Sequence, residues 1–457
     1  MDGYVDVDDH RSNDRRWLPW LVLVLALSAA LRLGVLLATP VRLYPDSPAY
    51  LALAREIGRL NLSADNGART PLYPAFLWVL GYQPSVARVV QMLLGLAITA
   101  MLFWTIWTLT RRSWAAALGA SMYGLSLTQI KYEAAVLTET PTTFLLVALA
   151  TTLTWLWIDR SRHLAIKITV AGLCAGLVPL GRPAYVYVPF ITVAAVLLWA
   201  PRLIRRWTIV VLLVATSFVP MLAWATFNYA RFDQFGLSTM TGFDLTNKTG
   251  TYIKDAPARY ATIRDIYVAG LEARGGHNPV DLIWSLVPRL EAATGESYPQ
   301  LSKTFLDMNL GLLPHHQAQY WKNVASVFAK TFMVDRYEPS LPRLGGATPA
   351  FFALYKWLSR LINLAFLLVS AWWIVRAIAS RSKPHITPAV WMAASALLAS
   401  LSSAIAIAGS DARFGMPTQP YVVCVVLVAV CSFARSARLR EDLAKSEREH
   451  VRVSPTA

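Results

Sequence analysis

The stretch WLPWLVLVLALSAALRLGVLL, from Trp17 to Leu37, decides the class of fold. It is long enough to cross the hydrocarbon core of a bilayer as a helix, which takes about 20 apolar residues. The polar residues before it include Arg11, Arg15 and Arg16, and no A-x-A cleavage site follows. We therefore expect a retained first span whose N-terminus lies in the cytoplasm, rather than a removed signal peptide.

The composition agrees with a chain whose solvent is lipid. Of the 457 residues, 55% are hydrophobic and 15% are charged, and the mean hydropathy is +0.42, which is too apolar for a soluble chain. The formal net charge of +16 comes from Lys and Arg in short clusters between apolar runs, and no basic soluble domain is visible. We expect an all-α polytopic membrane protein that lies in the bilayer and binds no nucleic acid.

About ten apolar stretches are long enough to span a bilayer. They lie near residues 17–37, 87–109, 114–130, 142–158, 165–180, 185–200, 207–227, 350–375, 388–408 and 416–434. Every second connection is rich in Lys and Arg, which is typical of cytoplasmic loops. These basic connections lie at 111–112, 160–162, 202–206, 376–383 and 435–440. Both termini are therefore predicted to be cytoplasmic, in what we expect to be a bacterial plasma membrane.

This pattern divides the chain into four parts. We expect an N-terminal transmembrane module over 1–227 that includes a catalytic first outer loop at 38–86. A long extracytoplasmic loop or small domain follows at 228–349, then C-terminal transmembrane helices at 350–434 and a cytoplasmic tail at 435–457. The three cysteines lie inside apolar runs without CxxC spacing, so we expect buried thiols and no disulfide.

Ionisable residues gather at or just beyond the outer ends of the predicted spans. They are Asp46, Arg69, Lys131, Glu133, Glu139, Arg182, Asp411 and Arg413. Charges at such positions are costly unless they pair or line a wet cavity. One convergent site is the economical explanation.

Asp46 lies in RLYPDSPAY, residues 42–50, directly before the amphipathic stretch 51–57. Such a stretch is expected to lie in the membrane interface, with Asp46 at the mouth of the helical bundle. An aspartate there can deprotonate a hydroxyl. It can equally cap the helix that begins near Ser47. The motif leaves both interpretations open.

The other charged residues also have a functional and a structural interpretation. Arg69 can clamp a phosphate at the interface or extend toward lipid headgroups. Glu139 can accept hydrogen bonds at the start of the fourth span, as a cap. Asp411 and Arg413 can form a salt bridge with each other.

Six short motifs, all on the predicted outer side, carry a resemblance. They are PDSPAY, RTPLYPAFL, TETPTTFL, GRPAYVYVP, WATFNYARFDQFGLSTMTGFDL and DARFGMPTQP. Together they resemble the multi-span glycosyltransferases that use dolichyl- or undecaprenyl-phosphate sugars. This GT-C superfamily includes the protein O-mannosyltransferases and the lipid A aminoarabinose transferase. The resemblance covers most of the chain, and it is greatest to the bacterial saccharide-modifying branch.

The resemblance implies a helical GT-C bundle with interfacial helices in its outer loops. It also implies transfer of a sugar from a polyprenyl-phosphate donor to a hydroxyl of a glycan, glycolipid or protein. The family's first-loop acid corresponds to Asp46, as the catalytic base, and the R-[FY]-x-x-P motif corresponds to Arg413. With Arg69 and Arg182, Arg413 is expected to bind the donor phosphate. Tyr50 and Tyr73, within the matching motifs, are further site candidates. The first-loop acid is single here, where many members have an Asp-Glu pair.

Two other functions remain as alternatives. A flippase for lipid-linked saccharides would place charged residues along a path through the bilayer, and the spans hold few of them. A polysaccharide polymerase or ligase would place Arg and His in a long outer loop, where His315 and His316 lie. Adjacent residues point in different directions on a helix or a strand, so we expect no metal at this pair. We expect no cofactor, and leave a divalent metal elsewhere in the site as an open alternative.

Overall fold

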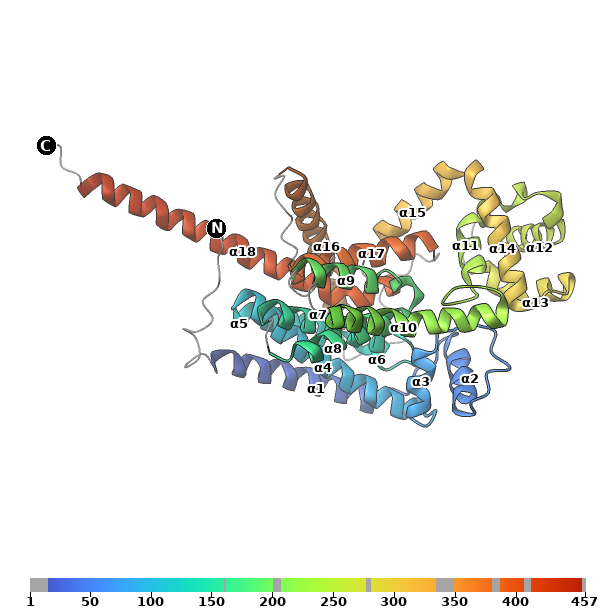
Figure 1. The fold of residues 1–457 in the computed structure, drawn as a ribbon, viewed down its shortest axis with the longest axis horizontal. Helices are drawn as coiled ribbons and strands as arrows, with labels where there is room; N and C mark the ends of the chain where they lie inside the picture. The colour runs from blue at the N-terminus through green and yellow to red at the C-terminus, as the bar shows by residue number, and fades with distance from the viewer. Residues whose placement is uncertain are drawn as a thin grey trace.

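The computed structural model describes residues 15–159, 162–199, 207–276, 281–333, 348–379, 387–406 and 412–453. These residues form helices, drawn in Figure 1, and one isolated parallel bridge between Arg42 and Ala135. The first half of the chain contains α1 (Leu18–Ala38), α2 (Ser47–Gly58), α3 (Leu72–Val79), α4 (Pro84–Thr110), α5 (Ser113–Gly124), α6 (Leu127–Glu133), α7 (Glu139–Ile158), α8 (Leu164–Gly181), η3 (Pro183–Tyr185), α9 (Val188–Trp199) and α10 (Trp207–Phe232).

The second half contains α11 (Thr241–Thr249), α12 (Ala261–Ala273), α13 (Leu282–Thr294), α14 (Tyr298–Leu312), α15 (Gln317–Thr331), α16 (Thr348–Ala379), α17 (Pro388–Ala406), η8 (Ala412–Thr418) and α18 (Gln419–Val453). Within the described residues, eight helices are long and apolar enough to cross a bilayer. They are α1, α4, α7, α8, α10, α16, α17 and α18. The all-helical membrane architecture expected from the sequence is therefore present.

Two of the ten expected spans are not single long helices. The stretch expected at 114–130 divides into α5 and α6, because Leu125 leaves the helical conformation and the Ser126 side chain accepts a hydrogen bond from the backbone of Gln129. The stretch expected at 185–200 begins as the short η3 turn and continues as α9, which is only 12 residues long. Turn chemistry at Ser126 and Pro183 thus interrupts both apolar runs.

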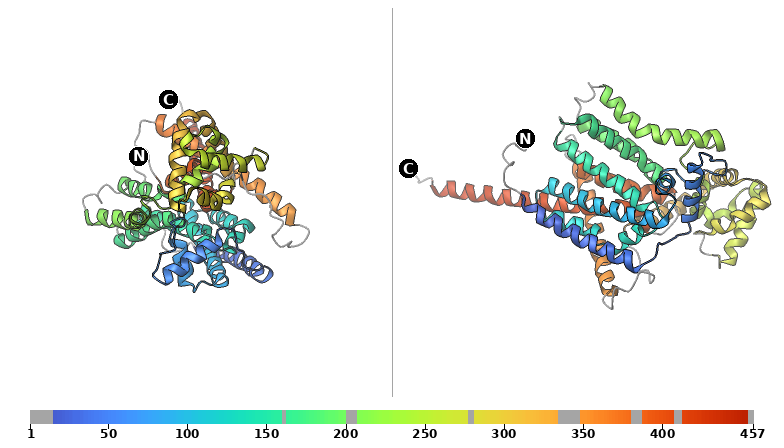
Figure 2. Two further views of the ribbon diagram at one scale, coloured as in Figure 1. Left: turned by 90° about the vertical axis from the view of Figure 1, so that its right-hand side faces the viewer. Right: turned by 90° about the horizontal axis from the view of Figure 1, so that it is seen from below.

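Most of the spanning helices run side by side, whereas α16 stands at a steep angle to them (Figure 1), and the connections of the parallel helices gather at two chemically different ends. Figures 1 and 2 show α2, α3 and α11–α14 together at one end, which we call the loop end. The other end, the basic end, holds the connections after α4 and α7 and carries Arg111 and Arg112. Cys431, on α18, is electrostatically coupled to both Arg112 and Arg435, so arginines distant in sequence share this end.

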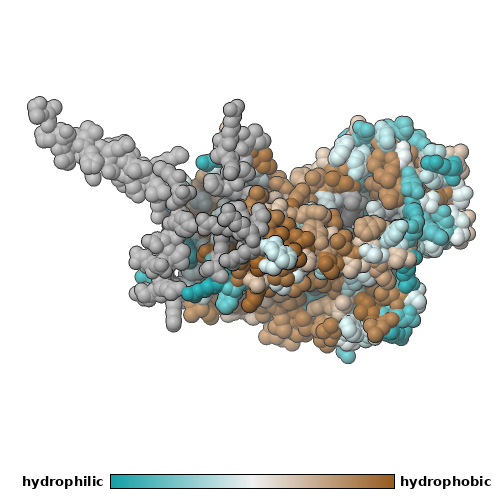
Figure 3. Space-filling view, in the orientation of Figure 1, coloured by the Kyte–Doolittle hydropathy of each residue, from teal (hydrophilic) through white to brown (hydrophobic). Residues whose placement is uncertain are grey.

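The faces of the bundle match a lipid environment. Figure 3 shows a continuous hydrophobic surface over the spanning helices and hydrophilic residues over the loop end. Large apolar side chains such as Val219 and Leu368 are 58% and 64% exposed, which is costly in water and favourable in lipid. Small residues on α5, including Ala115, Ala116 and Ala120, are fully buried, so the helices there approach closely.

The segment after α10 has a hydrophobic core of its own. Residues of α11–α14 form one buried cluster that includes Phe243, Tyr267, Ile283, Leu290 and Phe305. The segment thus folds as a small helical unit over the loop end of the bundle. It rests on α15 and α17 through a second, smaller cluster.

Candidate active site

Five charged side chains at the loop end form one chain of ion pairs. Nη2 of Arg69 lies 2.8 Å from Oδ1 of Asp46, and Nη2 of Arg413 lies 3.3 Å from Oδ2 of the same carboxylate. The Nε of Arg413 donates to Oε1 of Glu139, and Nη1 of Arg182 lies 3.1 Å from that oxygen. We call these five residues the arginine–carboxylate network. The structure thus brings together five of the eight charged residues expected at one site.

Asp46 is placed by the pairing of two loops. The backbone N–H of Arg42 donates to the carbonyl of Ala134 at 3.2 Å, and that of Val136 donates back to Arg42 at 3.1 Å. The Ser47 hydroxyl donates to the carbonyl of Val136 at 2.9 Å. These bonds hold the loop before α2 against the loop before α7. Asp46 therefore lies beside the first turn of α7.

The Asp46 carboxylate does not cap α2. Its side chain makes no hydrogen bond to the first turn of that helix, and each of its two oxygens accepts from an arginine instead. Burial raises the pKa of Asp46, but the charges of Arg69 and Arg413 outweigh burial and hold the pKa below its usual value. The capping interpretation of Asp46 is therefore wrong, and the carboxylate instead fixes the positions of Arg69 and Arg413.

Arg69 is placed by the segment after α10. The backbone N–H of Thr239 donates to Gly67 at 3.0 Å, and the Ser238 hydroxyl donates to Ala68 at 2.9 Å. On its other side, the hydroxyl of Thr70 reaches the carbonyl of Gly181, which directly precedes Arg182. Two loops of the loop end and the end of α8 therefore meet at Arg69.

Glu139 and Arg182 occupy the ends of adjacent helices. Glu139 is the first residue of α7, and Arg182 follows the last residue of α8 in an extended conformation. The two helices approach closely there, since a Cβ on Gly181 would lie 2.8 Å from the hydroxyl of Thr142. Glu139 is 2% exposed, whereas Asp46 is 30% exposed, so the network opens to solvent at its Asp46 end.

Arg413 joins the two carboxylates. It lies on η8, the short turn before α18, which packs against the start of α7. The side chain of Gln129 on α6 donates to the carbonyl of Met416 at 3.3 Å and fastens this turn to the bundle. Asp411, the proposed partner of Arg413, lies outside the described residues. The described partners of Arg413 are Glu139 and Asp46.

Two aromatic rings, on α2 and α3, lie beside the network. The guanidinium of Arg69 lies 5.0 Å from the ring centroid of Tyr50, a cation–π distance. Tyr50 in turn contacts Tyr73 edge to face, and the Tyr73 hydroxyl donates to Gln91 at 3.0 Å. The amide of Gln91 donates to the backbone of Ala135, which ties α4 to the paired loops. Both tyrosines are therefore neighbours of the network.

Glu133 does not join the network. It lies in a separate buried cluster, where Arg32 of α1 donates to both of its oxygens at 2.7 and 2.6 Å and the hydroxyl of Tyr123 donates at 3.2 Å. The break before α6 directs Glu133 toward α1 and α4, and the glycine at 95 leaves room for it, because a Cβ there would lie 2.3 Å from its carboxylate. Lys131 is buried on the same short helix, 5.0 Å from the ring of Tyr132.

Two residues near the network escaped the sequence analysis. Asp244 on α11 is electrostatically coupled to Arg69 and Asp46, and Tyr298 at the start of α14 is coupled to Arg69 and Asp244. Asp244 is the next-to-last residue of the motif WATFNYARFDQFGLSTMTGFDL. The sequence signal was an acid in a motif that carries the resemblance, but the same motif also contains Asp233, and the sequence alone does not distinguish the two.

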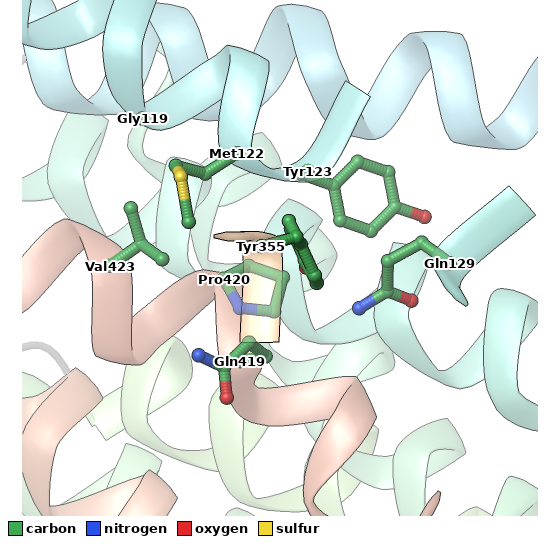
Figure 4. A pocket seen from close by; sticks show the side chains of 8 residues that line it. All are labelled: Gly119, Met122, Tyr123, Gln129, Tyr355, Gln419, Pro420 and Val423. Atoms are coloured by element: carbon green, nitrogen blue, oxygen red, sulfur yellow. The ribbon is translucent and has the colours of Figure 1, made fainter. Parts of the chain in front are cut away.

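A small internal pocket lies apart from the network. Figure 4 shows its lining side chains, which come from α5, α6, α16 and α18. Two of them, Tyr123 and Gln129, connect it to the Glu133 cluster and to η8 respectively. None of the five network residues lines this pocket.

The described residues contain no group of three or more His, Cys, Asp and Glu side chains that could hold a metal ion. His316, one of the adjacent pair, lies 3.2 Å from Asp255 and stacks on Tyr252 with the ring centroids 4.2 Å apart. Both contacts are within the outer segment, where they fix the turn before α15.

No family model and no curated protein matches the chain. Among solved structures, it is similar to the oligosaccharyltransferase of Archaeoglobus fulgidus in its apo form, with a TM-score of 0.49 and 16% identity over 94% of this chain and 52% of that one. A second structure of that enzyme, AglB, in complex with an inhibitory peptide and a dolichol-phosphate, gives a TM-score of 0.48 and 15% identity with the same coverage. The chain thus spans about half the length of the archaeal enzyme. ArnT from Cupriavidus metallidurans, bound to undecaprenyl phosphate, gives a TM-score of 0.34 and 14% identity over 93% of this chain and 80% of ArnT.

Proposed function

We propose that this protein is a membrane glycosyltransferase. It transfers a sugar from a polyprenyl-phosphate donor to a hydroxyl of a glycan, glycolipid or protein acceptor on the non-cytoplasmic side of a bacterial plasma membrane. The observation that carries the proposal is the arginine–carboxylate network, where three guanidinium groups and two carboxylates meet from five separate elements. The sequence motifs that resemble polyprenyl-phosphate glycosyltransferases contain all five residues.

The charge of the network suits a departing phosphate. Three arginines against two carboxylates leave one formal positive charge, since 3 − 2 = 1, in a partly buried place. Guanidinium groups bind phosphate as planar forks, and Asp46 and Glu139 fix the directions of these forks before any substrate arrives. Preorganised donors of this kind are worth about 3–4 kcal/mol each in other enzymes.

In the proposed reaction, the acceptor oxygen forms a bond to the anomeric carbon as the bond from that carbon to the phosphate oxygen breaks. The electron pair stays on the departing polyprenyl phosphate, and Arg69 and Arg413 neutralise the charge that develops there. The acceptor proton must pass to a base. Arg69 and Asp46 lie at the open end of the network, so the acceptor would enter from that side.

The position of the network suits a lipid-borne donor. It lies at the loop end, next to the apolar helix faces, so a phosphate at the membrane surface could reach it while its polyprenyl chain stayed in the bilayer. The excess of Lys and Arg at the basic end would place that end in the cytoplasm. The network would then face the non-cytoplasmic side.

Transport and polymerisation fit the described residues less well. A transporter would need charged groups along a wet path. Inside the bundle, Arg32 and Glu133 are 3% and 0% exposed and form an ion pair with each other. A polymerase with a catalytic histidine in its outer loop would need that histidine available, and His316 is held by Asp255 and Tyr252.

Binding of undecaprenyl phosphate to the purified protein tests the phosphate site. We expect this lipid to raise the Tm of the detergent-solubilised protein, and undecaprenol, which has the same chain without the phosphate, to leave the Tm unchanged. Equal shifts with both lipids, or no shift with either, would contradict a phosphate site. Analysis of lipids from a strain that lacks the gene would then identify the sugar, because the unused donor should accumulate.

A further inference from the structure

The reaction proposed above needs a base, and the geometry at Asp46 leaves it poorly suited to that task. One oxygen of Asp46 accepts from Arg69 at 2.8 Å and the other faces Arg413 at 3.3 Å. A carboxylate that gives both oxygens to arginines has a weak tendency to take a proton, and removing either contact would release the phosphate clamp. Asp46 therefore positions Arg69 and Arg413, and the base is expected on another element of the fold.

The other element is α11, which carries Asp244. The contacts of its neighbours on this helix show which face of α11 packs against α14. Gly242, Thr246 and Thr249 face α14, since the amide of Asn309 on α14 donates to the carbonyl of Gly242 at 3.0 Å and to the hydroxyl of Thr246 at 2.8 Å. The Thr249 hydroxyl donates to Oδ1 of Asn309 at 2.7 Å. With 3.6 residues per turn, Asp244 lies on the opposite face.

The start of α11 lies beside the network, because the residues just before it bind the residues just before Arg69: the backbone N–H of Thr239 donates to the carbonyl of Gly67 at 3.0 Å, and the Ser238 hydroxyl donates to that of Ala68 at 2.9 Å. The charges of Arg69 and Asp46 both act on the pKa of Asp244, in agreement with this placement. Asp244 is partly exposed. Within the described part of the chain, no hydrogen bond or ion pair to its carboxyl is found, unlike Asp46. Asp244 is therefore a half-buried carboxyl near the network that has no hydrogen-bond or ion-pair partner among the described residues.

We propose that Asp244 is the catalytic base that takes the proton of the acceptor hydroxyl, and that Asp46 is a positioning residue for Arg69 and Arg413. The inference rests on the proposed glycosyl transfer. The acceptor O–H bond breaks with its proton moving to a carboxylate oxygen of Asp244. An electron pair of the acceptor oxygen forms the new bond to the anomeric carbon. The bond from that carbon to the phosphate oxygen breaks, and its electrons stay on the departing polyprenyl phosphate. The proton leaves Asp244 to solvent afterwards.

The electrostatics of Asp244 agree with this role. Burial raises the pKa of Asp244 to about 7, with Arg69 acting to lower the pKa and Asp46 acting to raise it. A general base is most effective when its pKa lies near the working pH. The groups that face it are Arg69 and Asp46 from the first outer loop and Tyr298 from α14. None of these forms a direct pair with Asp244 in the described residues.

The test uses membranes of a strain lacking the gene, because these should contain both the unused donor and the unmodified acceptor. Purified full-length protein is added in detergent, and the release of polyprenyl phosphate is followed by mass spectrometry between pH 5 and 9. For the wild type we expect the rate to rise with pH through about 7, as Asp244 loses its proton. Asp244→Asn should lower the rate by roughly 10²–10⁴ and abolish this rise.

Two variants make the outcome specific. Asp233→Asn is the matched control, because Asp233 is an acid of the same outer region that is 75% exposed and paired with Lys303 at 2.7 Å, and it should behave as wild type. Asp46→Asn should weaken the Tm shift given by undecaprenyl phosphate, while the residual rate keeps its rise with pH. Asp244→Asn should keep the Tm shift, which also shows that it is folded.

Two results would overturn the assignment. If Asp244→Asn keeps both the rate and its rise with pH, Asp244 is not the base. If Asp46→Asn abolishes the rise instead, Asp46 is the base. A wild type that neither binds undecaprenyl phosphate nor releases polyprenyl phosphate would contradict the proposed function itself, which is a different outcome from either of these.

Discussion

Arg413 is the residue that links the two carboxylates of the network, and its shape matters as well as its charge. It donates through Nε to Glu139 and lies within 3.3 Å of Asp46 through Nη2. Lysine keeps the charge but has a single point of contact, so Arg413→Lys should lose its contact with one of the two carboxylates and no longer join them. We expect a loss of most of the Tm shift given by undecaprenyl phosphate. Arg376→Lys, an exposed arginine of α16, is the control and should retain the full shift.

Asp244 should also affect stability in a pH-dependent way. Its pKa is raised to about 7 in the folded protein, against an ordinary value of 3.8, so the folded state binds more protons between these two pH values. Stability contributed by the neutral carboxyl is therefore lost as pH rises toward about 7. Asparagine avoids that loss. We expect the advantage of Asp244→Asn in Tm over wild type to be small at pH 4 and larger at pH 8.

An unchanged difference in Tm at the two pH values would show that Asp244 titrates normally. A destabilising acid that faces an arginine–carboxylate network is hard to explain as a structural residue, because structural carboxylates usually pair.

At the scale of elements, the close contact between α11 and α14 decides where Asp244 points. A Cβ on Gly242 would lie 1.8 Å from the carbonyl oxygen of Ser302, so Gly242→Ala must push the two helices apart. We expect lower stability and lower transfer activity, since α11 carries the proposed base. Gly311→Ala on α14 is the control, because a Cβ there meets nothing within 4 Å. That change should stabilise slightly, by roughly 0.5–1 kcal/mol.

If Gly242→Ala keeps wild-type Tm and activity, the helices can separate without consequence. The position of α11 would then not control the site. The amide of Asn309 offers an independent check of the same contact, since its removal would take away three hydrogen bonds between α14 and α11. Each such bond contributes about 0.5–1.5 kcal/mol.

The sequence predicted the elements well where chemistry is local and poorly where it depends on packing. Glu139 and Arg182 were placed at one site because each stands at the end of an apolar run, and such ends share a membrane surface. The prediction that Glu133 belongs to that site is wrong, because the break before α6 turns Glu133 toward Arg32. A hydropathy pattern shows Arg32 only as one charge in an otherwise apolar span. Asp244 was missed because its position depends on the contact of α11 with α14.

At the scale of the whole molecule, the orientation in the membrane is the first consequence to test. The basic end should face the cytoplasm, so reporter fusions at Arg112, Arg160, Arg206 and Arg381 should give cytoplasmic signals. Fusions near Asp65 and Gly275 should give the opposite signal, because both lie in segments of the loop end, between α2 and α3 and after α12. A cytoplasmic signal at Gly275 would move α11 away from the proposed site of transfer.

The most direct test of glycosyl transfer is the fate of the lipid-linked sugar in membranes of a strain that lacks the gene. Wild-type protein, added in detergent so that no closed compartment remains, should convert the accumulated polyprenyl-phosphate sugar to polyprenyl phosphate, with the sugar appearing on an acceptor. Arg413→Lys should do so much more slowly. A lipid-linked sugar that stays intact with the wild type, after the protein has been shown to be folded by its Tm, would contradict transfer and favour a transport function.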